Sequence, residues 1–342
     1  MPYPKSRENS FLMPRKGPDA LARYRSLLQK AVRRGNDRLV VTTCALLESF
    51  GPREKGWVRD RAAVITFEEC WPLGGFLVFN KRFHSKVAAL VRAARSVKAK
   101  DATGLGLLAH RLTEGAKSVL DGSVEDRHLR IVAEAIERPE DFWGWAKISA
   151  AEAGQASAAL VDRSRHFRNA GMPRDRAIIQ AGAYLALRAP IPSIRPTECR
   201  EKSFPYWVAL DGHTPEGRRV LKDIARDLHI HLSQLEWVNY YFDGAAAGDA
   251  LPSYWWDRYC RWRFDQVGIP PEEAHLLWDP VRPQVIEALA EDSSLLHRDI
   301  YRWKMAHLDR IEFLTQQVDL FLEHFDEMTP DQLEIFGGED GE

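Results

Sequence analysis

The sequence predicts an all-α protein. Apolar residues recur at steps of three and four along most of the chain, which is the period of an amphipathic helix. The segments with this period end at glycine, proline or asparagine, which are the residues that stop helices. With 45% hydrophobic and 28% charged residues among 342, the chain has the composition of a globular protein with a sizeable core.

The first 190 residues predict a series of helices separated by short breaks. The first has apolar residues at Leu21, Tyr24 and Leu28, and it ends at Gly35. Gly154 interrupts one of the later helices. The predicted helices cover residues 17–34, 39–50, 57–70, 87–97, 105–120, 124–136, 141–167 and 175–188.

The composition changes after the proline cluster at 190–196. Residues 204–264 are rich in aromatic side chains, and residues 270–283 contain four prolines. Asp292 and Ser293 then begin a long amphipathic helix that we expect to reach Met328. Its apolar stripe suits either a coiled-coil seam or, as we favour, packing on its own domain.

Charge is distributed unevenly, although the net charge is −1. Residues 1–130 contain 25 Lys and Arg against 13 Asp and Glu, so residues 131–342 carry the opposite charge. The last 31 residues contain ten acidic residues and neither Lys nor Arg. A basic half is the expected footprint of a polyanion such as DNA. The alternative is that the two halves attract each other within the fold or between subunits.

The basic residues that best fit a DNA interface lie near the end of the first predicted helix and after residue 80. Lys and Arg neutralise backbone phosphates, and cations are also favoured at a helix C-terminus. A solvated helix face is the alternative. The predicted DNA-binding residues are Lys30, Arg33, Arg34, Arg38, Arg82, Lys86, Arg92 and Arg95.

Aromatic and arginine side chains alternate over residues 254–264, a pattern that also suits single-stranded nucleic acid. However, Trp255, Tyr259 and Trp262 are spaced as the core stripe of a helix. We therefore favour a helix that buries these rings and points its arginines toward solvent.

Familiar catalytic and cofactor motifs are absent from the sequence. It contains no phosphate-binding GxxxxGK[ST] loop, no HExxH and no GxSxG. The glycines at 104–106 are too few for a dinucleotide-binding fingerprint, and His229 and His231 would lie on different faces of a helix. Glu68 and Glu69 are adjacent, so on a helix we expect their side chains to point apart. We predict no metal, no cofactor and no ATP hydrolysis.

Asp211 and His213 are the weak catalytic candidates. Alternate residues of an extended segment face the same side, so the two side chains could activate water together. The following Thr214 and Pro215 form a good helix start, with Thr214 as the N-cap. The plain alternative is that the whole segment serves only to begin a helix.

Two separated segments carry a family resemblance. The first is LLQKAVRRGNDRLVVTTCALLESFG at 27–51, which continues as WVRDRAAVITFEECWPLG at 57–74. The second, more specific one is FRNAGMPRDRAIIQAGAYLALRAPIPS at 167–193. They resemble the C-terminal helical region of the clamp-loader-related AAA+ ATPases typified by bacterial replication-associated recombination protein A and its eukaryotic Werner-interacting relative. In addition, ALDGHTPEGRRVLK at 209–222 is similar to stand-alone collar-like proteins of phages and mobile elements.

In that family the matching region is an oligomerisation collar, typically of tetramers, so the resemblance implies a homo-oligomer. The small-residue stripe of the second segment would let a helix of another subunit come close; a tight helix pair within one chain is the alternative. The predicted interface residues are Ile178, Ala181, Gly182 and Leu185. The AAA+ ATPase module is not part of this sequence, and therefore the ATPase activity of the family is not implied.

These observations predict a clamp-loader-collar-like helical bundle with a helical insertion and a long C-terminal helix. We expect a mobile leader at 1–17, a collar-like domain at 18–200 with an insertion at 75–153, an aromatic-rich region at 201–290, the long helix at 291–330 and an acidic tail at 331–342.

The predicted function is that of a non-catalytic oligomeric scaffold or adaptor. It would act on DNA or on a DNA-processing partner in replication, repair or mobile-element biology. The alternatives are a hydrolase that uses Asp211 and His213, or a pure protein-interaction module that binds a AAA+ partner. No run of 18 apolar residues, no apolar segment near the start and no paired cysteines occur, so we expect a cytoplasmic protein without membrane contact.

Overall fold

The described part of the chain is all-helical. The computed structural model describes residues 18–79, 82–197, 203–245 and 249–325. The predicted leader at 1–17 and acidic tail at 331–342 lie outside these residues. Within them the chain forms fourteen α-helices and no β-strand, although three isolated β-bridges join loops. None of the helices described is long and apolar enough to cross a membrane.

The helices follow the sequence pattern closely as far as residue 188. They are α1 (Pro18–Arg33), α2 (Asp37–Ser49), α3 (Pro52–Cys70), α4 (Phe83–Ala94), α5 (Asp101–Thr113), α6 (Asp126–Glu137), α7 (Pro139–Ala153), α8 (Gln155–His166), α9 (Pro173–Arg188), α10 (Pro215–Asp227), α11 (Leu232–Asn239), α12 (Tyr254–Val267), α13 (Ala274–Ala306) and α14 (Leu308–Phe325). The predicted break between α7 and α8 is confirmed, because Gly154 has a φ of 94°.

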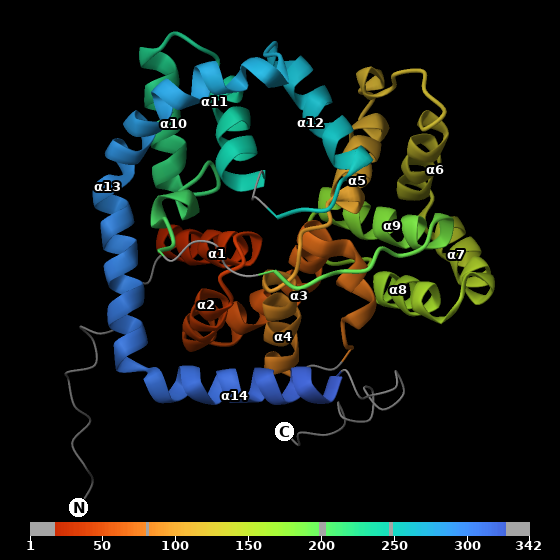
Figure 1. The fold of residues 1–342 in the computed structure, drawn as a ribbon, viewed down its shortest axis with the longest axis horizontal. Helices are drawn as coiled ribbons and strands as arrows, with labels where there is room; N and C mark the ends of the chain where they lie inside the picture. Colours follow the sequence, from red (N-terminus) through yellow and green to blue (C-terminus); the bar gives the residue numbers. More distant parts are fainter. Residues whose placement is uncertain (1–17, 80–81, 198–202, 246–248, 326–342) are drawn as a thin grey trace, which may run out of the picture.

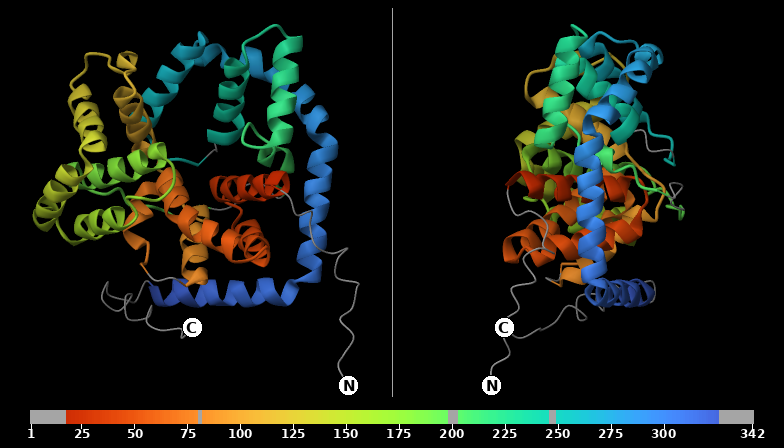
Figure 2. Two further views of the ribbon diagram at one scale, coloured as in Figure 1. Left: turned by 180° about the vertical axis from the view of Figure 1, so that it is seen from behind. Right: turned by 90° about the vertical axis from the view of Figure 1, so that its left-hand side faces the viewer.

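Two long helices frame the molecule. Figure 1 shows α13 along the left edge and α14 along the base, with α1 to α4 inside the angle between them. The helices α5 to α9 form the right-hand side, and α10 to α12 close the top. Figure 2 shows from behind and from the side that α14 starts at the lower end of α13 and runs away from it in a different direction.

The segment predicted as an insertion is built into this arrangement. Helix α4 packs on α2 and α3, and α5 lies against both α9 and α12. One hydrophobic cluster extends from α1 through α14. The helices of residues 75–153 therefore contribute to the same core as the rest of the chain.

The C-terminal helix differs from the prediction. A single helix beginning at 292 was expected, whereas α13 begins at Ala274 and contains Pro280 and Pro283. It ends before His307, whose ring stacks on Trp303 at 4.5 Å between centroids. Trp303 is fully buried, so this stacking holds the corner at which α14 begins. The predicted stripe is confirmed on α14, where Ile311, Leu314 and Val318 are buried.

Candidate functional site

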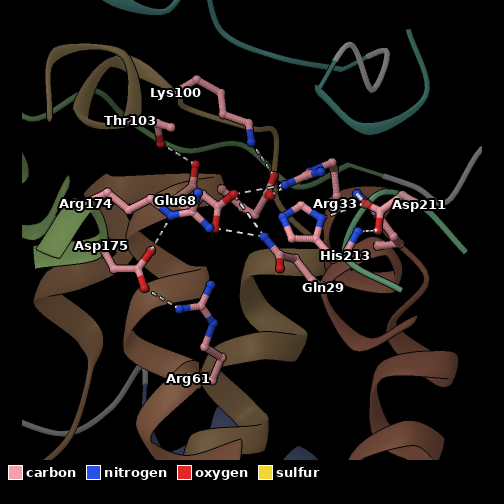
Figure 3. A network of polar contacts seen from close by, with 12 residues as sticks. Gln29, Arg33, Arg61, Glu68, Lys100, Thr103, Arg174, Asp175, Asp211 and His213 are labelled. Atoms are coloured by element: carbon pink, nitrogen blue, oxygen red, sulfur yellow. Dashed lines mark hydrogen bonds and ion pairs between the residues drawn. The ribbon is translucent and has the colours of Figure 1, made fainter. Parts of the chain in front are cut away.

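A network of buried ion pairs joins α1 to α3 at the centre of the molecule (Figure 3). The Nε of Arg33 donates to Oε1 of Glu69 over 2.7 Å, and its Nη2 donates to Glu68 Oε1 over 3.0 Å. The Nζ of Lys100 donates to the other oxygen of Glu69, also over 2.7 Å. Arg33, Lys100 and Glu69 are at most 3% exposed. Each of these buried charges is thus paired, as the cost of removing an ion from water requires.

Both adjacent glutamates take part in this network, although their side chains were expected to point apart. The forked guanidinium of Arg33 reaches both carboxylates. Gln29 also donates to both carboxylate oxygens of Glu68, over 3.0 and 2.9 Å. The hydroxyl of Thr103 donates to the backbone carbonyl of Glu68 over 2.7 Å. The network therefore ties α1, α3 and the start of α5 together.

Because of this network, we expect the protein to become less stable at acid pH. Burial by itself raises the pKa of Glu69, but the charges of Arg33 and Lys100 outweigh it and lower that pKa from 4.5 to about 2. A carboxylate with a lowered pKa in the folded state stabilises the protein above its unfolded pKa and stops doing so as the pH falls. We expect the free energy of unfolding, measured by urea titration, to decrease from pH 5 toward pH 2. An unchanged free energy between pH 5 and 3 would contradict the pairing of Glu69.

A second group of charges lies beside the network. The Nζ of Lys30 donates to Oδ2 of Asp211 over 2.7 Å, and Nδ1 of His213 lies 3.1 Å from the same oxygen. Burial acts to raise the pKa of Asp211, yet Lys30 and His213 together hold it well below its usual range. Asp211 is thus an anion. It holds Lys30 on one side and an imidazole, whose side chain is 64% exposed, on the other.

The local sequence explains how Asp211 and His213 meet. Asp211 Oδ1 accepts the backbone N–H of His213 over 2.9 Å, which forms a turn of the kind aspartate favours. Thr214 then caps α10 by accepting the N–H of Gly217, and Pro215 occupies the first turn, as predicted. A Cβ on Gly217 would lie 2.1 Å from the carbonyl oxygen of Asp211. Only glycine allows this turn to pack so closely on the start of α10.

These residues border a cavity of about 180 Å³. It lies between α1, α10, α11 and α13, next to the 3₁₀ helix η4 (Tyr206–Ala209), in the upper left of Figure 1. Its polar lining consists of Lys30, Asp211, His213, Glu236, Asn239 and Tyr240. Its apolar lining includes Trp207, Leu221, Val285 and Leu289. The catalytic candidates of the sequence are therefore brought together, and they stand at a cavity.

The predicted DNA-binding face is not formed as expected. Lys30, Arg33 and Lys86 are only 2–5% exposed, so they are not available to a phosphate backbone. Burial lowers the pKa of Lys86 to about 8, with Arg163 as a further cause. Lys30 and Arg33 do lie in the last turn of α1, as predicted, but the carboxylates that pair with them come from distant segments.

The other five predicted residues are divided between the surface and internal contacts. Arg38 and Arg95 are exposed, and Arg95 pairs with Asp37 at 2.7 Å and with Asp319 at 3.6 Å. Arg92 lies over the ring of Phe76, 4.3 Å from its centroid. Arg34 and Arg82 are partly buried. Much of the basic charge of the first half is therefore neutralised within the fold.

The predicted oligomer interface is also internal. On α9, Ile178 and Ala181 are at most 3% exposed, and Gly182 is buried. A Cβ on Gly182 would lie 2.9 Å from the ring of Phe67. Leu185 is partly buried against the same core. The small residues let α9 approach α3 and α5 of its own chain. These four residues do not form a surface for a second subunit.

The aromatic run forms α12, as the core interpretation predicts. Trp255 and Trp262 are buried and Tyr259 is partly buried. However, Arg258 does not point to solvent: it donates to the carbonyl of Val119 over 3.0 Å and pairs with Asp126. This arginine thereby links α12 to the start of α6.

Sequence reasoning missed most of the cavity. Glu236 and Asn239 lie on α11, Tyr240 follows directly after it, and Trp207 lies in the separate short helix η4. Their spacing matches no known motif. Of its lining, the sequence indicated only Asp211 and His213, as weak catalytic candidates, and Lys30, as a DNA-binding candidate.

No protein-family model matches this chain, and neither does any curated protein or solved structure. Within the described ranges, no three His, Cys, Asp or Glu side chains are grouped so that they would hold a metal ion. Cys44, Cys70 and Cys260 are free and buried. Cys199 lies outside the described residues.

Proposed function

We propose that this chain is a non-catalytic helical adaptor that associates with a second copy of itself. The support is the exposed apolar surface at the corner of α13 and α14. We call this the corner surface, and it consists of Tyr301, Met305, Leu308, Phe313 and Leu320, each 36–64% exposed. Exposed apolar side chains in such number on adjoining elements mark interaction sites in soluble proteins.

The helical spacing of these residues places them on one side of α13 and one side of α14. Tyr301 and Met305 are four residues apart, so they share one side of α13. Phe313 and Leu320 are seven apart and share one side of α14, opposite the buried Ile311 stripe. Because α13 and α14 meet at a fixed corner, a second chain that contacts one stripe lies close to the other. A symmetric dimer uses the same surface on both subunits.

The resemblance to clamp-loader collars supports a role beside a replication or repair protein, including a AAA+ partner. In this fold the matching segments lie on α1, α2, α3 and α9, and α3 contacts each of the other three. The basic run that matches the family, with Arg33, pairs with Glu68 and Glu69 of the later matching helix. Since Lys30, Arg33 and Lys86 of the predicted basic face are buried, the adaptor would act on a protein partner rather than on DNA.

Light scattering tests this proposal. At micromolar concentration we expect a mass of at least twice the 39.1 kDa of one chain. The combined variant Tyr301→Ser, Met305→Ser and Phe313→Ser should have the mass of a single chain, because it removes the apolar area that drives association. The matched control is Ile148→Ser on α7, where the wild-type residue is 72% exposed, and it should behave as the wild type. A wild type that stays monomeric would overturn the proposal.

A hydrolase is the second candidate, favoured by the contact between Asp211 and His213. When Nδ1 of His213 donates to Asp211, its Nε2 is left as an acceptor, which is how a carboxylate prepares a histidine to act as a general base. The test is hydrolysis of p-nitrophenyl acetate and p-nitrophenyl phosphate at neutral pH. Turnover by the wild type that is lost in His213→Ala supports an enzyme. Equal turnover by both proteins excludes His213 as its base.

A further inference from the structure

The cavity beside Asp211 has the size of a small heterocycle. Its volume is about 180 Å³. For comparison, an engineered apolar cavity of roughly 150 Å³ holds a benzene ring. One or two fused rings of about ten heavy atoms would therefore fill this space. The cavity opens to solvent beside His213, whose side chain is largely exposed.

The walls suit a flat ring. Trp207 and Tyr240 contribute aromatic surface, and Val285 and Leu289 of α13 contribute aliphatic surface. Aromatic and aliphatic walls favour the faces of a heterocycle, because these faces gain most by leaving water. The polar groups are confined to the part of the lining that comes from α1, α11 and the turn at 211–213.

Two polar side chains in that lining have no partner within the described part of the chain. Asn239 is 8% exposed, and its amide forms no hydrogen bond there. The carboxylate of Glu236 likewise forms no hydrogen bond or ion pair with a described residue. Both side chains border the cavity, so their hydrogen-bonding atoms are open to a ligand in it.

The charges of the lining select against an anion. Asp211 already neutralises Lys30 at 2.7 Å, and Glu236 then adds a negative charge. A neutral ligand that donates hydrogen bonds to a carboxylate fits this balance, whereas a phosphate inside the cavity would meet Glu236. An amide and a carboxylate are also the side chains that pair with the amino and ring nitrogens of nucleobases.

We propose that this cavity binds a nucleobase, with the ring between Trp207 and α13 and its polar edge on Asn239 and Glu236. The base could belong to a free nucleoside or to an unstacked position in a single strand, and both have this chemistry. This inference does not depend on self-association through the corner surface, and the two are tested by different measurements.

The glycine at 212 offers a direct way to block the site. A Cβ there would meet only Glu236 Oε1, at 3.7 Å, so a larger side chain enters the cavity mouth without meeting backbone. Gly212→Leu should therefore fold and close the cavity. Gly144→Leu is the matched control, because a Cβ on Gly144 of α7 would meet nothing within 4 Å and α7 does not line the cavity.

Calorimetric titration of the full chain with adenosine, guanosine, cytidine and uridine is the experiment. We expect at least one nucleoside to bind saturably, and Gly212→Leu to abolish binding while Gly144→Leu retains it. Glu236→Gln should weaken binding about tenfold, since it removes a charged acceptor. A parallel titration with single-stranded decamers of each base distinguishes the two sources of the ligand.

Each outcome decides the proposal. Binding of nucleosides, or of decamers only, that Gly212→Leu abolishes supports a nucleobase site and identifies its source. The proposal is overturned if neither nucleosides nor decamers bind at millimolar concentration. It is equally overturned if Gly212→Leu binds as well as the wild type, with its fold verified by circular dichroism.

Discussion

Replacing Arg33 with alanine is expected to destabilise the protein by about 3–5 kcal/mol, which is the typical cost of removing one partner from a buried ion pair. Arg33 is 2% exposed and holds both Glu68 and Glu69. Without it, Glu68 would be left with the amide of Gln29 and Glu69 with Lys100. Domains of ordinary stability unfold with about 5–15 kcal/mol, so much of the stability would be lost. Urea titration followed by circular dichroism measures this change.

Arg38→Ala is the matched control for that experiment. Arg38 lies five residues further along the chain, but its side chain is exposed, and exposed charges usually contribute within about 0.5 kcal/mol. From the sequence alone the two arginines belong to one predicted DNA-binding face, whose alternative is a solvated helix face. Equal, small effects of the two substitutions would restore that view and contradict the buried network.

The helices were predictable because their signals are local. Thr214 followed by Pro215 begins α10, and Gly154 separates α7 from α8, each through chemistry that involves only neighbouring residues. The prediction failed where a local signal was overridden. The prolines at 280 and 283 indicated a break, yet they lie inside α13, where burial of Trp278 and Val281 in the core favours a continuous helix.

The candidate site was less predictable because its partners are distant in the sequence. Lys30 lies next to the apolar stripe of α1, and only its contact with Asp211, 181 positions away, decides that it faces inward. The same holds for Arg33 and Glu69. A basic run at a helix end looks identical in one sequence whether it meets phosphate or a buried carboxylate. The partner that the basic side chain meets in the folded structure distinguishes these two cases. Hydrophobic periodicity carries no information about that partner.

The role of the glycines at 104 and 106 also could not be predicted, because it depends on contacts with distant segments. They are too few for a nucleotide-binding loop, and the sequence offered no other role for them. In the structure they let α5 approach its neighbours, since a Cβ on Gly106 would lie 2.7 Å from backbone atoms of Ala177 and Ile178 on α9. Close helix contacts of this kind are set by the partner helix, which the spacing of the glycines does not identify.

Gly104→Ala is therefore expected to destabilise the protein, by about 3 kcal/mol, the upper end of what overpacking usually costs. The new Cβ would lie 2.2 Å from the carbonyl of Trp255 and 2.4 Å from the backbone nitrogen of Trp256. Backbone atoms cannot turn aside, so the start of α12 would have to move away from α5. That movement would also strain the hydrogen bond from Ser253 to Asp101, now 2.6 Å long.

Gly144→Ala is expected to change the stability of the protein in the opposite direction, although Gly144 also lies in a helix. Gly144 lies within α7, and a Cβ there would meet nothing within 4 Å. Alanine in a helix is favoured over glycine by about 0.5–1 kcal/mol, so this variant should be slightly more stable than the wild type. Thermal unfolding of the two variants side by side separates helix propensity from packing. If Gly104→Ala also gains stability, α5 and α12 do not approach as closely as the structure places them.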